Sequence, residues 1–285
     1  MSGGPDSVAL AQLLHRLRRR YRLQLGAVYI NHQLRPRAAV KEEKFCQTLC
    51  DRLGIPLTII RENIPARAKR ERKGIEETAR DFRYETFATI AVSENYARIA
   101  LGHHIDDRVE TVLFRIVRGT GLTGLAGIPV KRGKIIRPLY DLRKADILEY
   151  LRRNRFAWCE DLSNDRPAYD RNFIRHELLP LLRKRLNRSV DRAILNLSET
   201  TADEAVVIEA VVTKAVRRSV AVSAGGKVLV RVETMHTYHK WLRYRILRAC
   251  FALLGEEMPD REVIVRLDQV LSGARKALSL PHQLR

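Results

Sequence analysis

Apolar residues in the first part of the chain follow two alternating patterns. Short apolar runs of strand length are separated by longer stretches in which apolar residues recur every three or four positions, the period of an amphipathic helix. The expected strands cover residues 25–30, 56–60 and 97–101, and the expected helices cover 5–20, 40–53, 75–91 and a stretch from 105. Strands and helices in this order form right-handed βαβ units. The pattern predicts an α/β fold with a parallel sheet, whose ligands bind at the carboxyl ends of the strands.

Two of the expected helices carry further signals. Gly54 follows the second helix at the position where a glycine commonly ends a helix, and Pro56 lies just beyond it. The helix from residue 105 has one apolar face, made of Ile105, Val109, Val112, Leu113, Ile116 and Val117.

The alternation of strands and helices ends near Asn187. A long helical stretch over residues 189–220, a strand over 227–232 and helical segments over 234–254 and 260–271 follow. We therefore expect an α/β domain over residues 1–187 and a smaller, mainly helical domain over 188–285.

The net charge of the chain indicates which class of partner it binds. The 285 residues include 53 Lys and Arg against 33 Asp and Glu, a net charge of +20 and a pI near 10.3. A surplus of this size favours a polyanionic partner, usually nucleic acid, and a basic surface without a partner is the alternative. No apolar run approaches the ~18 residues of a membrane span, and the N-terminus has no signal-peptide core.

The cysteines indicate a reducing compartment. Cys46, Cys50, Cys159 and Cys250 are too few and too irregularly spaced for a disulfide framework. Cys46 and Cys50 are four residues apart on an expected helix, which is a weak metal signal. We interpret them as reduced core thiols of a cytoplasmic protein.

The segment Ser2-Gly3-Gly4-Pro5-Asp6-Ser7 opens the first expected helix. Glycines let a backbone approach a ligand closely, and the helix N-terminus adds a positive partial charge, so the segment suits a phosphate. Asp6 is placed to hold Mg²⁺ that bridges phosphates. An ordinary N-cap after a glycine turn is the alternative. The lysine of the Gly-x-x-x-x-Gly-Lys-Ser/Thr loop is absent, and the segment instead resembles the pyrophosphate loop of the N-type ATP pyrophosphatases, which adenylate a carbonyl-type oxygen.

Three later segments carry polar groups at the expected sheet edge or on a helix. His32 and Arg35 follow the first expected strand, and Arg80 and Tyr84 share a face of the helix over 75–91. The last segment, 102–111, follows a strand and holds the polar residues His103, His104, Asp106, Asp107 and Glu110. Its carboxylates also favour a helix N-terminus, so helix capping is the alternative role. No ligand spacing recurs elsewhere to support structural zinc.

These segments occur in one order that resembles the tRNA(Ile)-lysidine synthetase family. The resemblance includes His-x-Leu-Arg after a strand, Glu-x-x-Ala-Arg-x-x-Arg-Tyr and Gly-His-His-x-Asp-Asp-x-x-Glu-Thr. It continues through residues 118–128, Arg137-Pro138-Leu139 and residues 160–180. It therefore extends from about Ser2 to Leu182.

The resemblance implies a ligase that forms a carbon–nitrogen bond. Such enzymes use ATP, Mg²⁺ and free lysine to convert the wobble cytidine in the CAU anticodon of tRNA(Ile) to lysidine. The base is first adenylated at its C2 oxygen, and the lysine ε-amine then displaces AMP. The helical second domain would bind tRNA. A tRNA sulfur transferase of the same superfamily and a non-catalytic RNA-binding protein are the alternatives, although the chain has no C-x-x-C pair. A homodimer is left open.

The resemblance also implies roles for individual residues. The ATP site would comprise Ser2, Gly3, Gly4, Pro5, Asp6, Ser7, His32, Arg35 and His103, with Mg²⁺ held by Asp6 through the pyrophosphate. The catalytic residues would be Asp6, Arg80, Asp106 and Asp107. Lysine would bind Asp106, Asp107 and Glu110, and tRNA would bind Arg152, Arg153, Arg171 and Arg175. Because a free lysine amine has a pKa of ~10.4, a carboxylate must help remove its proton, and Asp106 and Asp107 are equal candidates.

Both ends of the chain depart from the family pattern. The family has an apolar strand directly before Ser-Gly-Gly, whereas only Met1 precedes Ser2 here. We expect that Met1 stands for an internal valine codon, GUG, read as a start. Residues 278–285 resemble the beginning of a further strand, so this end is also expected to be cut. The chain as written is therefore expected to be less stable and poorly active.

Overall fold

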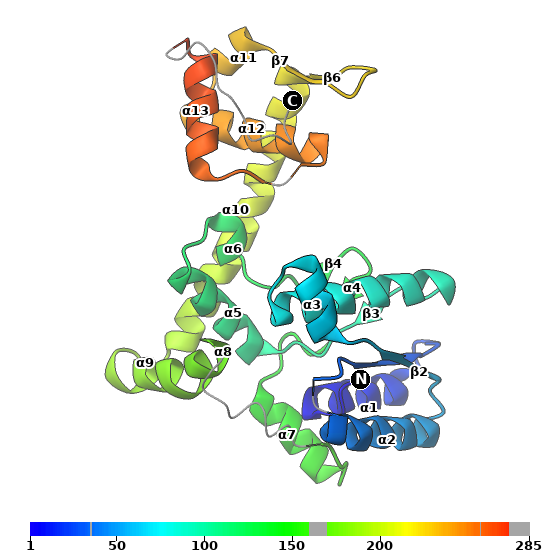
Figure 1. Cartoon of the computed structure of the whole chain (residues 1–285). Coiled ribbons are helices and arrows are strands. Elements are labelled where there is room, and N and C mark those ends of the chain that lie inside the picture. The colour runs from blue at the N-terminus through cyan, green and yellow to red at the C-terminus, as the bar shows by residue number, and fades with distance from the viewer. Residues whose placement is uncertain (35, 160–169, 257, 274–285) are drawn as a thin grey trace. The chain divides into compact units, whose positions relative to one another are not determined.

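The computed structural model describes residues 1–34, 36–159, 170–256 and 258–273 (Figure 1). Arg35, the motif residues 160–169 and the expected strand at 278–285 lie outside the described residues, as does the side chain of Arg171. The chain divides into two compact units, Met1–Glu199 and Thr200–Arg285. This division falls inside helix α10 (Val190–Ser219), whereas the sequence pattern placed a boundary before that helix.

Within its described residues, the first unit has five short strands in two sheets. They are β1 (Ala27–Asn31), β2 (Leu57–Arg61), β3 (Ile99–Ala100), β4 (Lys131–Arg132) and β5 (Ile135–Ile136). β1 pairs with β2 and β3 pairs with β5, both in parallel, while β4 pairs antiparallel with β5. The parallel pairing confirms the predicted α/β class, and β4 and β5 were not predicted.

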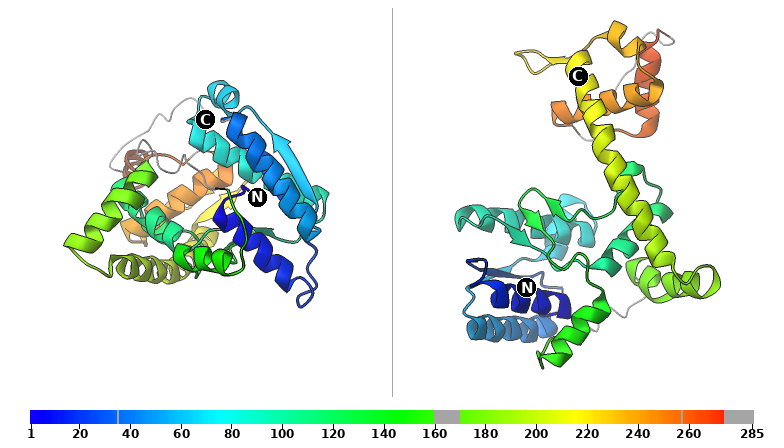
Figure 2. Two further views of the ribbon diagram at one scale, coloured as in Figure 1. Left: turned by 90° about the horizontal axis from the view of Figure 1, so that it is seen from below. Right: turned by 180° about the vertical axis from the view of Figure 1, so that it is seen from behind.

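Helices surround these strands, and α1 and α2 lie side by side in every view (Figures 1 and 2). The helices are α1 (Pro5–Leu17), α2 (Pro36–Leu53), α3 (Ile64–Glu71), α4 (Ile75–Ser93), α5 (Ile105–Val117), α6 (Leu122–Leu125), α7 (Lys144–Arg153), α8 (Asp170–Phe173) and α9 (Leu179–Arg185), with a π-helical turn at Ile174–Leu178. The predicted helices correspond to α1, α2, α4 and α5. Gly54 follows α2 with φ +61°, as expected for a terminating glycine.

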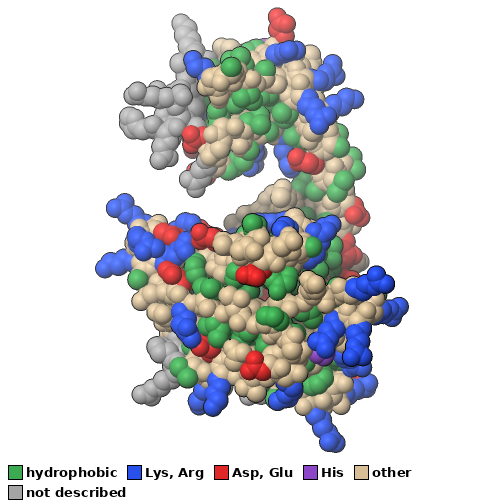
Figure 3. Space-filling model, turned by 90° about the vertical axis from the view of Figure 1, so that its right-hand side faces the viewer, with side chains coloured by type: hydrophobic (Ala, Val, Ile, Leu, Met, Phe, Trp, Pro, Cys, Tyr) green, Lys and Arg blue, Asp and Glu red, His purple; other side chains and the backbone are tan. Residues whose placement is uncertain are grey.

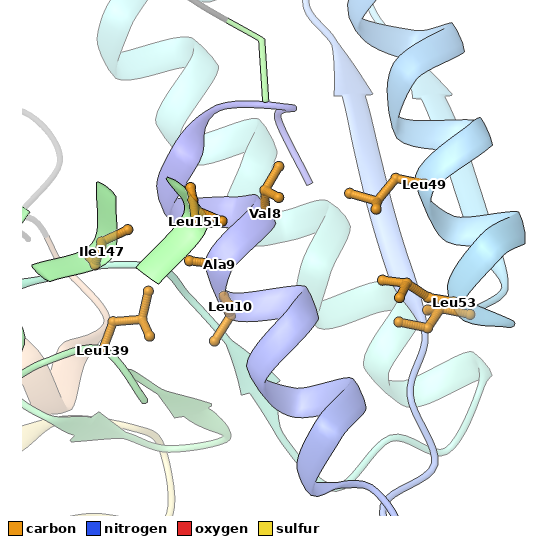
Figure 4. Packing of buried hydrophobic residues seen from close by; sticks show 9 residues of the cluster. Val8, Ala9, Leu10, Leu49, Leu53, Leu139, Ile147 and Leu151 are labelled. Carbon is orange, nitrogen blue, oxygen red and sulfur yellow. The ribbon is translucent and has the colours of Figure 1, made fainter. Parts of the chain in front are cut away.

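The core beneath the glycine loop is built around α1. Val8 and Leu10 of α1 are buried between Leu49 of α2 and Leu151 of α7 (Figure 4). A second core packs α5 against the segment that contains Ile174 and Leu179. These contacts fix the N-terminal ends of α1, α5 and α7, from which the polar residues of the site project.

The second unit is mainly helical. It has β6 (Val220–Val222), β7 (Val228–Val230), α11 (Val232–His236), α12 (Lys240–Leu254) and α13 (Arg261–Leu271). β6 and β7 form an antiparallel hairpin of which only β7 was predicted, and the single segment expected over 234–254 is two helices. Its core includes Met235, Ile246, Phe251 and Ile264. Across the described ranges, no helix combines the length and the apolar character that crossing a membrane requires.

Candidate active site

The glycine loop at the start of α1 is held in one conformation by the chain that follows α7. Gly3 has φ +78°, and a Cβ there would lie 3.1 Å from Cys159 Sγ. The Cys159 amide donates a hydrogen bond of 2.9 Å to the Gly3 carbonyl, and Ser7 Oγ donates one of 2.9 Å to the Gly4 carbonyl. These contacts fix the loop at the N-terminus of α1, and a helix N-terminus is an arrangement that suits a phosphate.

The segment between β3 and α5 packs directly on this loop. A Cβ at Gly102 would lie 3.2 Å from the Asp6 carbonyl oxygen, so the two backbones approach as closely as a glycine allows. Two residues later, the His104 amide donates a hydrogen bond of 3.0 Å to Asp107 Oδ2 and caps α5. The glycine loop and the first turn of α5, with its carboxylates, therefore lie side by side.

His104 lies at the centre of three carboxylates. Its side chain is only 3% exposed, and its Nε2 atom lies 3.6 Å from Asp6 Oδ1 and 3.5 Å from Asp107 Oδ2. Its Nδ1 atom lies 3.4 Å from Asp106 Oδ2. Burial alone would lower the pKa of His104, but the contact with Asp106 and the charges of Asp107 and Asp6 outweigh it and raise that pKa. The His104 imidazole therefore lies in contact with all three carboxylates, which favour its protonated form.

Lys144 is the second cation of the cluster. Its Nζ atom lies 2.6 Å from Asp6 Oδ1, and its amide donates a hydrogen bond of 2.8 Å to Asp106 Oδ2. Burial would raise the pKa of Asp106, but the close contact with His104 and the hydrogen bond from the Lys144 amide lower it to about 2. Asp106 is therefore ionised throughout the physiological range.

Glu110 and Arg175, for which the sequence predicted different ligands, contact each other. Arg175 donates two hydrogen bonds to the Glu110 carboxylate, of 2.6 and 2.8 Å, and its Nη2 atom lies 3.7 Å from Asp107 Oδ1. The Glu110 side chain is 6% exposed, and burial raises its pKa despite the opposing effect of Arg175. The Glu110 carboxylate is therefore already paired with Arg175 in this structure.

Two further predicted histidines line the same edge in the neutral form. Burial lowers the pKa of His32, at the end of β1, to about 4. Burial also lowers the pKa of His103 to about 4, against the opposing charge of Asp107, and Arg137 Nε lies 3.3 Å from its Nδ1 atom. Arg80 is exposed, and its guanidinium lies 5.2 Å from the Tyr84 ring, which confirms their shared face on α4.

Sequence reasoning did not assign roles to His104 and Lys144. In the structure Lys144 is the first residue of α7, where a cation opposes the helix dipole. Arg152 and Arg153 are near the other end of α7 and are not brought together with these residues.

The donor set agrees with Mg²⁺ that is held largely by a substrate. Among the described residues, no three His, Cys, Asp or Glu side chains are grouped to hold a metal ion. Asp6 offers one carboxylate beside a phosphate-type loop, and Mg²⁺ is commonly bound through one or two carboxylates plus phosphates.

Comparison with known proteins agrees with the geometry of the site. A family model described as a PP-loop domain matches residues 1–182. The solved U34-tRNA thiolase NcsA from Methanococcus maripaludis, with its 4Fe–4S cluster, superposes with a TM-score of 0.57 over 71% of each chain, at 18% identity. The fold and the glycine loop define a PP-loop protein.

Curated relatives identify the family to which the chain belongs among PP-loop proteins. The tRNA(Ile)-lysidine synthase of Chlorobaculum tepidum is 36% identical over 90% of this chain and 77% of its own length. Those of Clostridioides difficile and Geobacter sulfurreducens are 34% and 37% identical, and the matches cover 63% and 54% of their lengths. The chain belongs to the tRNA(Ile)-lysidine synthase family, and it spans about half to three quarters of these relatives.

Proposed function

We propose that this chain ligates free lysine to C2 of the wobble cytidine in the CAU anticodon of tRNA(Ile). In the first step the C2 oxygen of the base attacks the α-phosphate of ATP, and pyrophosphate leaves. In the second step the lysine ε-amine attacks C2, the C2–oxygen bond breaks, and AMP leaves. The observation that carries the proposal is the cluster of Asp6, Asp106 and Asp107 around His104, directly beside the glycine loop.

ATP would be held by the segment Ser2–Ser7, through backbone amides other than that of Pro5, which has no N–H. His32, Arg35 and His103 would lie around the nucleotide. The buried Nδ1 atom of His32 has no hydrogen-bond partner among the described residues, so a polar atom of a ligand can satisfy it. Asp6 would hold Mg²⁺, which when bound neutralises charge on the phosphates. Lys144, now paired with Asp6, would then contact the phosphates.

The lysine substrate would bind at Asp106, Asp107 and Glu110 because its ammonium group needs anionic partners. Asp106 holds a proton poorly, since its pKa is about 2. We therefore assign proton removal from the ε-amine to Asp107. Arg80 would bind the lysine carboxylate or the phosphates. Lysine must also compete with Arg175 for Glu110, because these two side chains are already paired.

Transfer RNA would be bound by basic side chains of the first unit. Residues 1–199 contain 39 Lys and Arg against 24 Asp and Glu, and residues 200–285 contain 14 against 9, so most of the surplus belongs to the first unit. Lys and Arg side chains stand in several groups around the first unit in Figure 3. Arg152, Arg153, Arg171 and Arg175 are proposed contacts, and the cytoplasm is the proposed location.

The sulfur-transferase alternative is disfavoured by the state of the thiols. Cys46 and Cys50 are fully buried, and burial raises the pKa of Cys46 to about 12 and also raises that of Cys50. A thiol of this kind is a poor nucleophile and a poor cluster ligand, because both roles need the thiolate.

The proposal is tested with ATP–pyrophosphate exchange and labelled lysine. Exchange should require an unmodified tRNA transcript with a CAU anticodon, and label should enter that tRNA only with ATP. A transcript with a CAC anticodon is the matched control. Sulfur incorporation without lysine would establish the transferase, and binding without exchange would establish a non-catalytic RNA-binding protein.

A further inference from the structure

The C-terminal ends of α1, α2 and α7 form a dense arginine surface on the first unit. We call it the arginine end, and it consists of Arg19, Arg20, Arg22, Arg52, Arg152 and Arg155. All six are exposed, and none forms an ion pair within the described part of the chain. The neighbouring Arg153 is paired with Glu149. Unpaired like charges repel one another, so this concentration is unfavourable unless an anion binds there.

Specific contacts bring the three helix ends together although they are distant in sequence. Arg16 Nη1 lies 3.4 Å from Asn154 Oδ1, which joins the ends of α1 and α7. Arg18 Nη1 donates a hydrogen bond of 3.0 Å to the Leu53 carbonyl, which joins the ends of α1 and α2. Figure 4 shows α1 lying between the buried side chains of α2 and α7. The six arginines therefore share one surface.

This surface lies at the opposite edge of the fold from the active site. α1 begins beside Asp6 and α7 begins at Lys144, and these two residues are in contact. Both helices end at the arginine end, and the 13 residues of α1 place it ~20 Å from the carboxylate cluster at 1.5 Å per residue. The chain after α1 and α2 then leads to the amino ends of β1 and β2.

Helix dipoles account for only part of the arginine end. A basic residue in the last turn of a helix is favourable, which suffices for Arg52 and Arg152. Arg20 and Arg22 lie beyond Leu17, the last residue of α1, so the dipole of that helix does not account for them. The adjacent Tyr21 is 58% exposed, and the Arg20 guanidinium lies 5.5 Å from its ring. Exposed arginines beside an aromatic ring are typical of nucleic-acid surfaces.

We propose that the arginine end binds the phosphate backbone of double-stranded RNA, about 20 Å from the reacting base. Double-stranded RNA is bound mainly through its shape, phosphates and 2′-hydroxyls, which suits guanidinium groups spread over three helix ends. RNA is favoured over an anionic membrane because the proposed substrate is an RNA, and in that respect the inference rests on the proposed function. The arginine end supplies affinity that does not depend on the base sequence of the RNA, and it takes no part in the chemistry.

The test compares two double variants with the same change of charge. Arg20→Glu/Arg52→Glu alters the arginine end, and Lys131→Glu/Arg132→Glu alters the exposed strand β4. Affinities for a tRNA(Ile) transcript and for an unrelated RNA hairpin are measured by fluorescence anisotropy across a salt series. The first variant should bind both RNAs about tenfold more weakly. The negative slope of log K against log salt should become shallower, its magnitude decreasing by roughly two. Adenylation at saturating tRNA should be unchanged.

Three outcomes would overturn the inference. Equal weakening in both double variants would show that net charge alone matters, and unchanged affinity in the first would show that the surface binds no RNA. Binding of the parent to phosphatidylserine vesicles, lost in the first variant while RNA affinity persists, would assign the surface to a membrane. Equal thermal midpoints establish that both variants fold. If the expected RNA effects appear but the parent ligates no lysine, the arginine end stands and the proposed function fails.

Discussion

Lys144 Nζ lies 2.6 Å from Asp6 Oδ1, although 138 residues separate them in the chain. Each belongs to the first turn of a helix, α7 and α1 respectively, and both helices begin at the edge that carries the carboxylate cluster. The cation at the start of α7 opposes that helix dipole, and the Asp6 carboxylate offsets this. A phosphate at the loop would compete with Asp6 for the same ammonium group.

Lys144→Met should therefore weaken ATP binding by at least about tenfold, or 1.4 kcal/mol, because it removes a charge-assisted contact to phosphate. Isothermal titration calorimetry measures the effect, and Lys144→Arg should retain part of the affinity. Unchanged ATP affinity together with a lower thermal midpoint would give Lys144 a purely structural role.

Asp6→Ala should abolish formation of the adenylate, because Mg²⁺ and the pyrophosphate lose their protein anchor. Single-turnover adenylation with labelled ATP measures this step. Asp51→Ala, which changes an exposed carboxylate near the end of α2, is the matched control and should react normally. Normal adenylation by the Asp6 variant would refute its role in holding the metal.

Asp106→Asn and Asp107→Asn should leave adenylation intact and impair the step that uses lysine. Asp106→Asn should mainly raise the KM for lysine, whereas Asp107→Asn should mainly slow the second step, because Asp107 is the proposed proton acceptor. Rapid-quench measurement of labelled lysine transfer to preformed adenylate separates the two effects. If both variants keep the parent's lysine dependence, the carboxylates serve only to cap α5.

The pair Glu110–Arg175 should behave as one unit. Arg175→Ala leaves a buried carboxylate without its partner, which should cost about 1–3 kcal/mol of unfolding free energy. Glu110→Gln should destabilise the chain as well, and the double variant should lose less than the sum of the single losses. Chemical denaturation of the four proteins completes the cycle, and strict additivity would show that the pair contributes nothing.

His32 should make the folded chain sensitive to acid. Burial lowers its pKa to about 4, below the ordinary value of 6.5. The unfolded chain therefore binds the proton first, and the stability that the neutral ring contributes is lost as pH falls from about 6.5 to 4. His32→Gln should flatten the fall of the thermal midpoint over this range. An NMR titration of the His32 ring with a midpoint near 6.5 would contradict this account.

The sequence predicted those helices whose apolar residues are strictly periodic, such as α1 and α2. It did not reveal α3, because only Ile64 and Ala68 of that helix are buried and the rest is mostly basic. The pattern placed Ile116 and Val117 on the apolar face of α5, and in the structure these two side chains are 42% and 68% exposed. The hydrophobic cluster on α5 includes Val109, Val112 and Leu113 but neither Ile116 nor Val117.

The candidate site was also only partly predictable from the sequence. The carboxylates of residues 102–111 were identifiable because they follow a strand and begin a helix. Lys144 was not, because it lay within a run of basic residues and its contact with Asp6 exists only in the folded chain. The pairing of Glu110 with Arg175 was hidden for the same reason.

The close approach of Gly102 to Asp6 limits which sequences this site can tolerate. A methyl group at residue 102 would require the Asp6 backbone to move by a few tenths of an ångström, and Asp6 also contacts Lys144 and His104. Gly74, at the start of α4, has nothing within 4 Å of its Cβ position. In a library of single substitutions, residue 74 should accept alanine freely, whereas alanine at residue 102 should be recovered only with a compensating change in residues 2–7. The sequences at residue 102 and at residues 2–7 can therefore change only together.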